Sequence, residues 1–266
     1  MNPRDHFEAL GYTILRGLFN RTEISFIDKH VDPVYRKWAH GNNTEIYRNR
    51  LVNMHSLTLP EHFQDNPDQR VEFFEAIAPA KLTEAIEDIF GPGIHFHNTQ
   101  LFFNPTNAER LPYWHRDMQY SPIEDDVQRD ELRRMLSLHI RIPLVEERGV
   151  ELVPGTHRRW DTELERNVRF ELNDSKNSDP LPNSELIDLA PGDVLIFHAQ
   201  MIHKGNYEMN STRKALDLCV GKYHPLTSSF LDEHVLPTKA ELAAIENSQW
   251  YDLAIDIASR NRRGSP

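Results

Sequence analysis

The sequence predicts an α+β protein that is mainly β, with helices packed outside a β core. The hydrophobic period is about 3.6 residues near both ends of the chain and 2 in its middle. Clusters of Pro, Gly, Asn and Asp separate the alternating segments, as they separate strands. No linker poor in apolar residues divides the chain. We therefore expect residues 1–266 to form one domain, in which 236–263 is a C-terminal helical extension.

The N-terminal third predicts one strand and two helical stretches. Residues 11–17 are typical of a short strand between two glycines. From Thr22, which we expect to cap the first turn, apolar residues recur at helical spacing, and Pro33 should kink this helix. Residues 70–90 are helical again, with a break at Pro79 and a Gly-Pro-Gly stop after them.

The middle of the chain predicts strands with two long interruptions. Residues 105–134 and 158–185 should be irregular, and the polar second segment should be poorly ordered until ligands close it as a lid. Helical spacing returns at 237–260. The expected strands are 95–103, 135–144, 186–189, 194–198 and 214–223.

Composition excludes several classes of protein. Lys and Arg number 30 against 41 Asp and Glu, a net charge of −11, so a nucleic-acid binder is disfavoured. Cys219 is the single cysteine, and one cysteine cannot form an internal disulfide. The first 17 residues lack the apolar stretch of a signal peptide, and no window is apolar enough to span a membrane. We expect a cytoplasmic protein.

A His-x-Asp pair offers the first chemical signal. In an extended chain, residues i and i+2 project to the same side, so a histidine and an aspartate so spaced can bind one metal ion. His115 and Asp117 follow a segment of extended character. His30 and Asp32 have the same spacing, but they lie in a helical pattern where i and i+2 diverge by roughly 200°. On pattern alone, polar loop residues remain the commoner interpretation of the first pair.

A second cluster follows the turn at 191–193. The segment 194–197 is typical of a buried strand, and His198 and His203 lie beyond its end. Arg213 then opens the next strand. A histidine that ends one strand and an arginine that begins its neighbour can face the same cavity.

Four motifs follow one another along the chain. They are the segment FEALGYTILRGLF, the WHRD at 114–117, the PGTH at 154–157, and the PGD strand with its distal histidine and arginine. In this order they resemble the phytanoyl-CoA dioxygenase family of iron(II)- and 2-oxoglutarate-dependent oxygenases. The resemblance covers about residues 5–223. Two positions depart from the family pattern: Arg116 replaces a common Gln, and Arg148 replaces the Asn of an Asn-Gly turn.

The resemblance implies a set of functional residues. The iron(II) ligands fall on His115, Asp117 and His203, and the arginine that binds 2-oxoglutarate falls on Arg213. His198 competes for the third ligand position, and the family pattern favours His203. A facial triad of two histidines and one carboxylate leaves open positions for a bidentate cosubstrate and O2. An arginine presents paired donors to the far carboxylate of 2-oxoglutarate.

Two strands are expected to add polar residues to the pocket. Asn98 and Gln100 alternate with Thr99 and Leu101, so their amides share one face. In the family this strand contacts 2-oxoglutarate or waters on the metal. Outward, solvent-facing amides are the alternative. Ser137, His139 and Arg141 likewise share one face, which either meets solvent or lines the cavity. In the family the corresponding position faces the cosubstrate pocket, so the resemblance implies that Arg141 lines the cavity. Because no acidic residue shares that face of its strand, a bound anion is its expected partner.

The resemblance implies a double-stranded β-helix, a jelly-roll barrel of the cupin type, buttressed by N- and C-terminal helices. The implied reaction hydroxylates a small molecule and releases succinate and CO2, and an intact Asp117 favours hydroxylation over halogenation. Arg116, Arg141 and Lys204 near the expected pocket favour a substrate with an anionic group. Two alternatives remain open: a catalytically silent barrel that binds or senses a ligand, and a zinc hydrolase with the same ligands.

Overall fold

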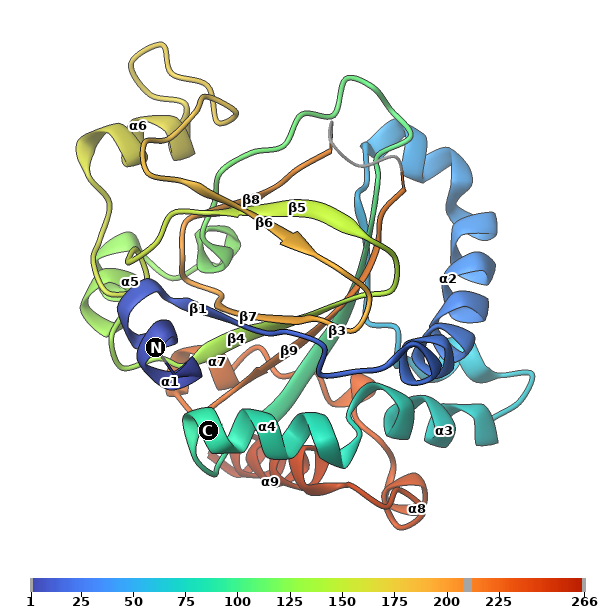
Figure 1. Ribbon diagram of the computed structural model, residues 1–266. Coiled ribbons are helices and arrows are strands. Elements are labelled where there is room, and N and C mark those ends of the chain that lie inside the picture. The colour runs from blue at the N-terminus through green and yellow to red at the C-terminus, as the bar shows by residue number, and fades with distance from the viewer. Residues whose placement is uncertain (1, 208–211, 265–266) are drawn as a thin grey trace.

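A computed structural model describes residues 2–207 and 212–264 and shows two facing antiparallel sheets (Figure 1). The larger sheet has the strand order β1-β7-β4-β9-β3-β2, and the smaller has the order β6-β5-β8. This arrangement is the jelly-roll barrel that the resemblance implied. The strands are β1 (Tyr12–Leu15), β2 (Asn53–His55), β3 (His95–Phe103), β4 (Ser137–Pro143), β5 (Glu147–Leu152), β6 (Glu185–Leu189), β7 (Val194–His198), β8 (His203–Gly205) and β9 (Lys214–Gly221).

Helices gather on the outer side of the larger sheet, where Figure 1 shows α4 and α9 beneath it. The α-helices are α1 (Pro3–Leu10), α2 (Arg21–Asn49), α3 (Asp68–Ile77), α4 (Ala80–Phe90), α5 (Asp125–Glu131), α6 (Glu163–Phe170), α7 (Pro225–Ser228), α8 (Lys239–Leu242) and α9 (Gln249–Gly264). Short 3-10 turns are η1 (Pro60–Phe63), η2 (Asp117–Tyr120) and η3 (Glu233–Val235).

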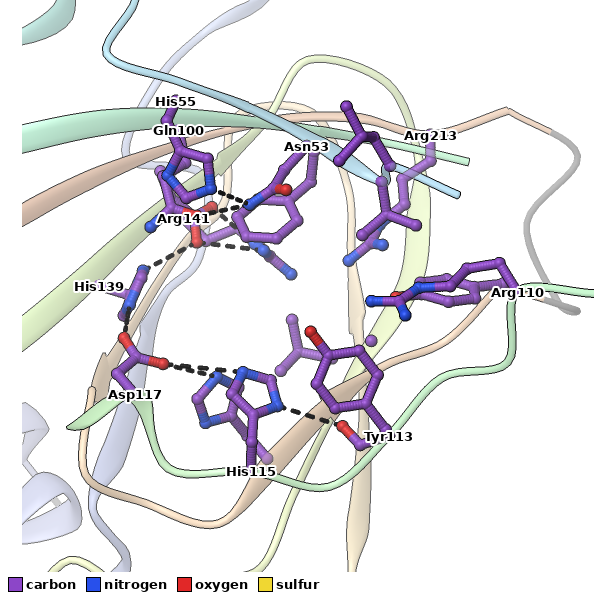
Figure 2. Close-up of a pocket in the computed structure, with 18 of the residues that line it drawn as sticks. Asn53, His55, Gln100, Arg110, Tyr113, His115, Asp117, His139, Arg141 and Arg213 are labelled. Carbon is purple, nitrogen blue, oxygen red and sulfur yellow. Dashed lines mark hydrogen bonds and ion pairs between the residues drawn. The ribbon is translucent and has the colours of Figure 1, made fainter. Parts of the chain in front are cut away.

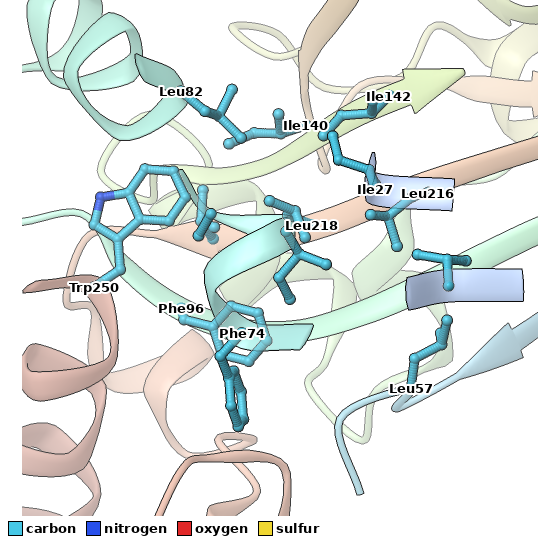
Figure 3. Packing of buried hydrophobic residues seen from close by; sticks show 14 of the residues in the cluster. Ile27, Leu57, Phe74, Leu82, Phe96, Ile140, Ile142, Leu216, Leu218 and Trp250 are labelled. Carbon is cyan, nitrogen blue, oxygen red and sulfur yellow. The ribbon is translucent and has the colours of Figure 1, made fainter. Parts of the chain in front are cut away.

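Alternation along β4 and β9 separates an apolar face from a polar one. Leu138, Ile140 and Ile142 of β4 point to the helices, and Leu216 and Leu218 of β9 do the same (Figure 3). Burying each such side chain stabilises the fold by about 1.5–3 kcal/mol. The intervening residues of both strands face the inside of the barrel. The alternation of apolar and polar residues along these strands therefore places a hydrophobic core on one side of the sheet and a polar cavity on the other.

The N- and C-terminal helices complete the outer core. Phe74 of α3, Leu82 of α4 and Trp250 of α9 are buried in the same cluster as the sheet residues (Figure 3). The Tyr251 hydroxyl of α9 donates to the Phe74 carbonyl at 2.8 Å. These contacts hold the sheet rigid from outside, and they leave the opposite face free for function.

Apolar side chains pack between the two sheets. Val150 and Leu152 of β5 pack with Ile187 of β6 against Leu195 and Phe197 of β7. A backbone bridge between His115 and His203 also joins the loop before η2 to β8. The interior that remains open lies beside this bridge.

Most predicted strands are confirmed, and the missed ones are short or irregular. The predicted bounds of β3 and β7 are those of the structure, and the other predicted strands overlap β4, β6, β9 and β1. Three strands were not predicted. β2 and β8 have three residues each, too few to show alternation, and the register of β5 shifts between Arg148 and Val150, which breaks its period.

Four predictions outside the strands need correction. Asn20, rather than Thr22, caps α2, in a capping box with Glu23. The two segments predicted to be irregular contain η2, α5 and α6. The second segment does have apolar anchors, since Val168 and Leu181 are buried beside Trp114, so the predicted lack of apolar surface is wrong. Residues 237–260 form two helices rather than one.

Pro33 lies inside α2, which continues to Asn49. Within the described residues, no helix has the length and apolarity that crossing a membrane requires.

A buried pair of histidines lies at one end of β3. Both ring nitrogens of His95 are buried without a hydrogen-bond partner, and its ring centroid lies 4.4 Å from that of His97. Burial lowers the pKa of His95 to about 4, and burial together with the neighbouring His95 lowers the pKa of His97 to about 3. Both rings are therefore neutral in the folded protein at neutral pH.

We expect His95→Leu to make the protein less sensitive to acid. The pKa of His95 is about 4 in the folded protein, against 6.5 for a free imidazole. Above pH 6.5 the ring is neutral in both states and does not change the free energy of unfolding. As the pH drops from 6.5 towards 4, the unfolded state binds a proton first, so the free energy of unfolding falls. At pH 5 the loss from this group is about 2 kcal/mol. The urea midpoint of unfolding is measured at pH 7.5 and at pH 5. Its decrease between the two should be larger in the parent and in the exposed control His40→Leu than in His95→Leu. Equal falls in all three would contradict the assignment.

Candidate active site

A cavity of about 420 Å³ opens between the two sheets (Figure 2). Its walls come from β2, β3, β4, β7 and β9 of the larger sheet and from β5 and β8 of the smaller. The end of α2 with the loop after it, the segment from Arg110 to Tyr120, and the loop before Arg213 complete them. The lining residues are Asn49, Arg50, Leu51, Val52, Asn53, His55, Gln100, Phe102, Arg110, Tyr113, His115, Asp117, Tyr120, His139, Arg141, Val150, Phe197, His203, Gly205, Tyr207, Arg213 and Asp217.

Three potential metal ligands meet at one end of the cavity. One ligand atom from each of His115, Asp117 and His203 lies within 4.8 Å of the others. Asp117 Oδ1 is 3.7 Å from His115 Nε2 and 3.4 Å from His203 Nε2. The backbone bridge between the two histidines sets this geometry, because it fixes the loop against β8. The structure thus brings together the three residues that the resemblance implied as ligands.

Each histidine has its Nε2 turned inward by a hydrogen bond at the other nitrogen. His115 Nδ1 lies 3.1 Å from the Tyr113 carbonyl, and His203 Nδ1 lies 3.0 Å from the Met201 carbonyl. A carbonyl accepts only, so Nδ1 carries the proton and Nε2 keeps a lone pair. Burial, with the neighbouring His115, lowers the pKa of His203 to about 3. The ring is therefore neutral, as metal binding requires.

His139 of β4 holds the carboxylate of Asp117. Its Nε2 donates to Asp117 Oδ2 at 2.6 Å, and its Nδ1 lies 3.2 Å from Asp217 Oδ2. Burial opposes protonation of this ring, but Cys219, Asp117 and Asp217 together raise its pKa well above 6.5. Burial likewise opposes ionisation of Asp117, yet the adjacent histidines hold its pKa far below the usual range. His139 occupies Oδ2 and leaves Oδ1 facing the two other rings.

Two arginines lie deeper in the cavity, each paired with a carboxylate. Arg141 Nε donates to Asp217 Oδ1 at 2.7 Å, and Arg213 Nε donates to Glu147 Oε1 at 2.8 Å. Arg141 Nη1 lies 3.5 Å from the same oxygen of Glu147. The Nη1 atoms of both arginines are buried and make no hydrogen bond. Two guanidinium donors thus remain for an anion.

The prediction for Arg141 is half confirmed. It does line the cavity, and it is buried. The prediction that a bound anion is its partner is wrong as stated, because Asp217 lies directly opposite on β9. The search for an acid covered only the residues of β4, whereas the partner comes from the neighbouring strand. Only Arg141 Nη1 is left for a ligand.

Of the two amides predicted on β3, only Gln100 lines the cavity. It accepts a hydrogen bond from Asn53 Nδ2 of β2 at 2.9 Å. The Asn98 side chain instead donates to Ser56 Oγ at 3.0 Å, and Asn98 is absent from the lining. A register shift between Phe96 and Asn98 marks an irregularity at this point of the strand.

Two other cations expected near the pocket have protein partners. Arg116 is fully buried, where it pairs with Asp161 and donates to the Thr156 carbonyl at 2.7 Å. Lys204 pairs with Glu151 at 3.0 Å and lies 4.5 Å from the Trp114 ring centroid. Neither residue lines the cavity. Arg116 anchors the His-x-Asp segment to the neighbouring loops, and it does not contact ligand space.

Three other histidines, at positions 30, 198 and 224, lie outside the cluster of His115, Asp117 and His203. His198 Nε2 lies 3.0 Å from the Met135 carbonyl, and its Nδ1 accepts from the Gln200 amide. His30 and Asp32 lie on α2, as their helical pattern predicted. His224 caps α7.

Several lining residues were not predicted. Tyr113, Tyr120 and Tyr207 lie in loops or turns, where no periodicity marks them. Asp217 alternates with Leu216 and Leu218, and this signal could have placed it on the polar face.

Comparison with known proteins identifies the family. A profile of the phytanoyl-CoA dioxygenase (PhyH) family matches residues 7–215. The chain belongs to this family. It is an iron(II)- and 2-oxoglutarate-dependent dioxygenase that acts on a small molecule, as the sequence motifs predicted. The same assignment disfavours the silent barrel and the zinc hydrolase.

The chain is also similar to a curated protein in sequence and to solved structures in fold. The ectoine dioxygenase of Sphingopyxis alaskensis is 24% identical over 218 residues, covering 75% of this chain and 68% of that protein. The apo structure of EctD from S. alaskensis has a TM-score of 0.56 at 18% identity, covering 87% and 79% of the two chains. The α-ketoglutarate-dependent epimerase SnoN from nogalamycin biosynthesis has a TM-score of 0.55 at 15% identity, covering 87% of each.

For this member of the family, we expect His139→Leu to weaken divalent metal binding about ten- to a hundredfold, the usual range for losing a group that orients a metal ligand. Asp117 Oδ2 would lose its donor and the carboxylate would rotate. His139→Gln, which retains a donor, should keep more of the affinity. Competition with a chromophoric chelator measures Co(II) affinity, and His224→Gln is the control. An unchanged affinity in His139→Leu would show that the contact is incidental.

Proposed function

We propose that this dioxygenase hydroxylates its substrate, with His115, Asp117 and His203 as the iron ligands and Arg213 as the main 2-oxoglutarate-binding residue. One observation carries the proposal. Three neutral or anionic donors converge at one end of a buried cavity in which unpaired guanidinium N–H groups also lie. Few arrangements other than a metal with an anionic cosubstrate use both features.

The donor set suits iron(II). Two imidazole Nε2 atoms and one carboxylate oxygen on one side are typical of sites that keep coordination positions open. His139 secures the second oxygen of Asp117, so the carboxylate is offered through one atom. Iron bound here would supply the oxygen chemistry that couples conversion of 2-oxoglutarate into succinate and CO2 to hydroxylation.

The arginine pair accounts for cosubstrate selection. Arg213 Nη1 and Arg141 Nη1 are both buried and make no hydrogen bond, although Arg141 Nη1 lies 3.5 Å from Glu147 Oε1. A carboxylate placed between the two nitrogens would accept from both. Gln100 adds an amide on the adjacent strand. Glu147 holds the Arg213 guanidinium through Nε, and the Gly149 carbonyl accepts from Nη2 at 3.2 Å, so Nη1 is left for the ligand.

The apolar walls favour oxidation over hydrolysis. Phe197 stacks on His139 with a ring centroid distance of 4.9 Å, and Phe102 lies beneath Arg141 at 4.5 Å. These rings limit the access of water to the reacting groups. A zinc hydrolase would need a free general base, whereas Asp217 is engaged by two cations.

We further propose that the substrate bears an anionic group, because Arg50, Arg110, Arg141 and Arg213 all line the cavity. The chain would act as one domain, since α9 packs in the same core as the barrel strands. A reducing cytoplasm suits a protein whose single cysteine is unpaired.

We expect single alanine substitutions of His115, Asp117 and His203 each to abolish 2-oxoglutarate turnover. Each removes one of three donors, and two donors hold iron(II) too weakly. Succinate formation measures activity, and the Co(II) affinity measured in parallel separates lost metal from lost chemistry. His30→Ala on α2 is the control and should remain nearly as active as the parent. Activity retained in His203→Ala but lost in His198→Ala would move the third ligand to His198.

We expect Arg213→Gln to weaken 2-oxoglutarate binding at least tenfold. Truncating one partner of a buried charge pair costs on the order of 2–5 kcal/mol. The visible band of the anaerobic iron(II) complex reports the dissociation constant, and circular dichroism checks that the variant is folded. Arg141→Gln should weaken binding less, because Asp217 and Glu147 already share that guanidinium. A dissociation constant unchanged in Arg213→Gln would refute its assigned role.

A further inference from the structure

Arg110 differs from the other cations of the cavity. It lies in the loop that leads to the metal ligands, and Figure 2 shows its guanidinium directed into the cavity. Its Nε is buried and makes no hydrogen bond. Across residues 2–207 and 212–264, no carboxylate forms an ion pair with it, whereas the rim residue Arg50 pairs with Glu109 at 2.6 Å. Such a buried donor is costly unless a ligand satisfies it.

Two tyrosines lie near this guanidinium. Its carbon lies 4.5 Å from the Tyr113 ring centroid, and Tyr207 lines the same cavity. An arginine offers only donors, and the phenol O–H of a tyrosine can donate as well. Arg110 and Tyr207 therefore supply N–H and O–H donors to the cavity.

The same arrangement argues against a cationic ligand. Clustered aromatic rings can bind ammonium groups through their faces. Here Arg110 already covers the Tyr113 face, and Arg213 lies 5.7 Å from the Tyr207 ring centroid. A second cation would meet two guanidinium groups. An anion would instead meet donors from both.

We propose that Arg110 and Tyr207 bind a carboxylate of the substrate, which is a small organic acid. The inference rests on the proposed function, since the cosubstrate occupies Arg213 and leaves Arg110 for the substrate. Arg110 and the ligand histidine His115 belong to one loop, so the acid group is fixed relative to the oxidised carbon. Arg110 is thereby a specificity residue of this chain.

The test uses the anaerobic iron(II) and 2-oxoglutarate complex with benzoate and benzamide as probes. The two differ in charge but share a planar ring. Isothermal titration should show benzoate binding to the parent at least tenfold more tightly than benzamide. Arg110→Gln should remove that preference and leave the 2-oxoglutarate dissociation constant unchanged. Arg110→Lys, which retains the charge, should keep part of the preference for benzoate over benzamide. Arg129→Gln, an exposed arginine on α5, is the matched control and should behave as the parent.

The outcomes separate the two proposals. Failure of the parent to form the visible 2-oxoglutarate band would refute the proposed function. A normal band with equal affinity for benzoate and benzamide would overturn only the role of Arg110. So would full benzoate binding by Arg110→Gln. Loss of the band on adding benzoate would place the probe in the cosubstrate site and would equally overturn the inference.

Discussion

Asp217 lies fully buried on β9 at the centre of the larger sheet, and the polar half of the cavity is arranged around it. Both of its oxygens accept from Arg141, and Oδ2 also faces His139. His139 in turn fixes Asp117, and Arg141 reaches Glu147, which holds Arg213. A buried carboxylate must be compensated in this way, because a charge in a medium of low dielectric is costly without partners. One carboxylate thus orients groups at both ends of the cavity.

The apolar side of the same strands gives the sheet its rigidity. Leu216 and Leu218 flank Asp217 and are buried beneath the helices. Close packing of these residues allows little movement of β9, so the polar groups on its other face keep their positions. Packing outside the barrel and preorganisation inside it are therefore two results of one alternating pattern.

Features that depend on neighbouring residues of one strand could be predicted from the sequence, whereas features that depend on which strands pair could not. The alternation of β4 placed Arg141 in the cavity correctly, because side-chain direction depends only on parity within a strand. Its partner Asp217 depends on which strand lies next to β4 and in what register, and no local pattern contains that information. The prediction that Asn98 contributes to the pocket was wrong for a related reason, because an irregular register between β3 and β9 alters its surroundings. The ligands were found because a resemblance supplied the long-range pairing of His115 with His203.

The alternating charges from Asp117 through His139, Asp217, Arg141 and Glu147 to Arg213 restrict how this pocket can evolve. Removing any one group leaves its neighbour buried and uncompensated, so a single substitution costs more than the matched replacement of a pair. Strong epistasis follows between positions that are distant in the sequence. Loop residues that line the cavity, such as Arg110, do not belong to this series of paired charges. New substrate preferences should therefore arise more readily at these loop positions than among the paired residues.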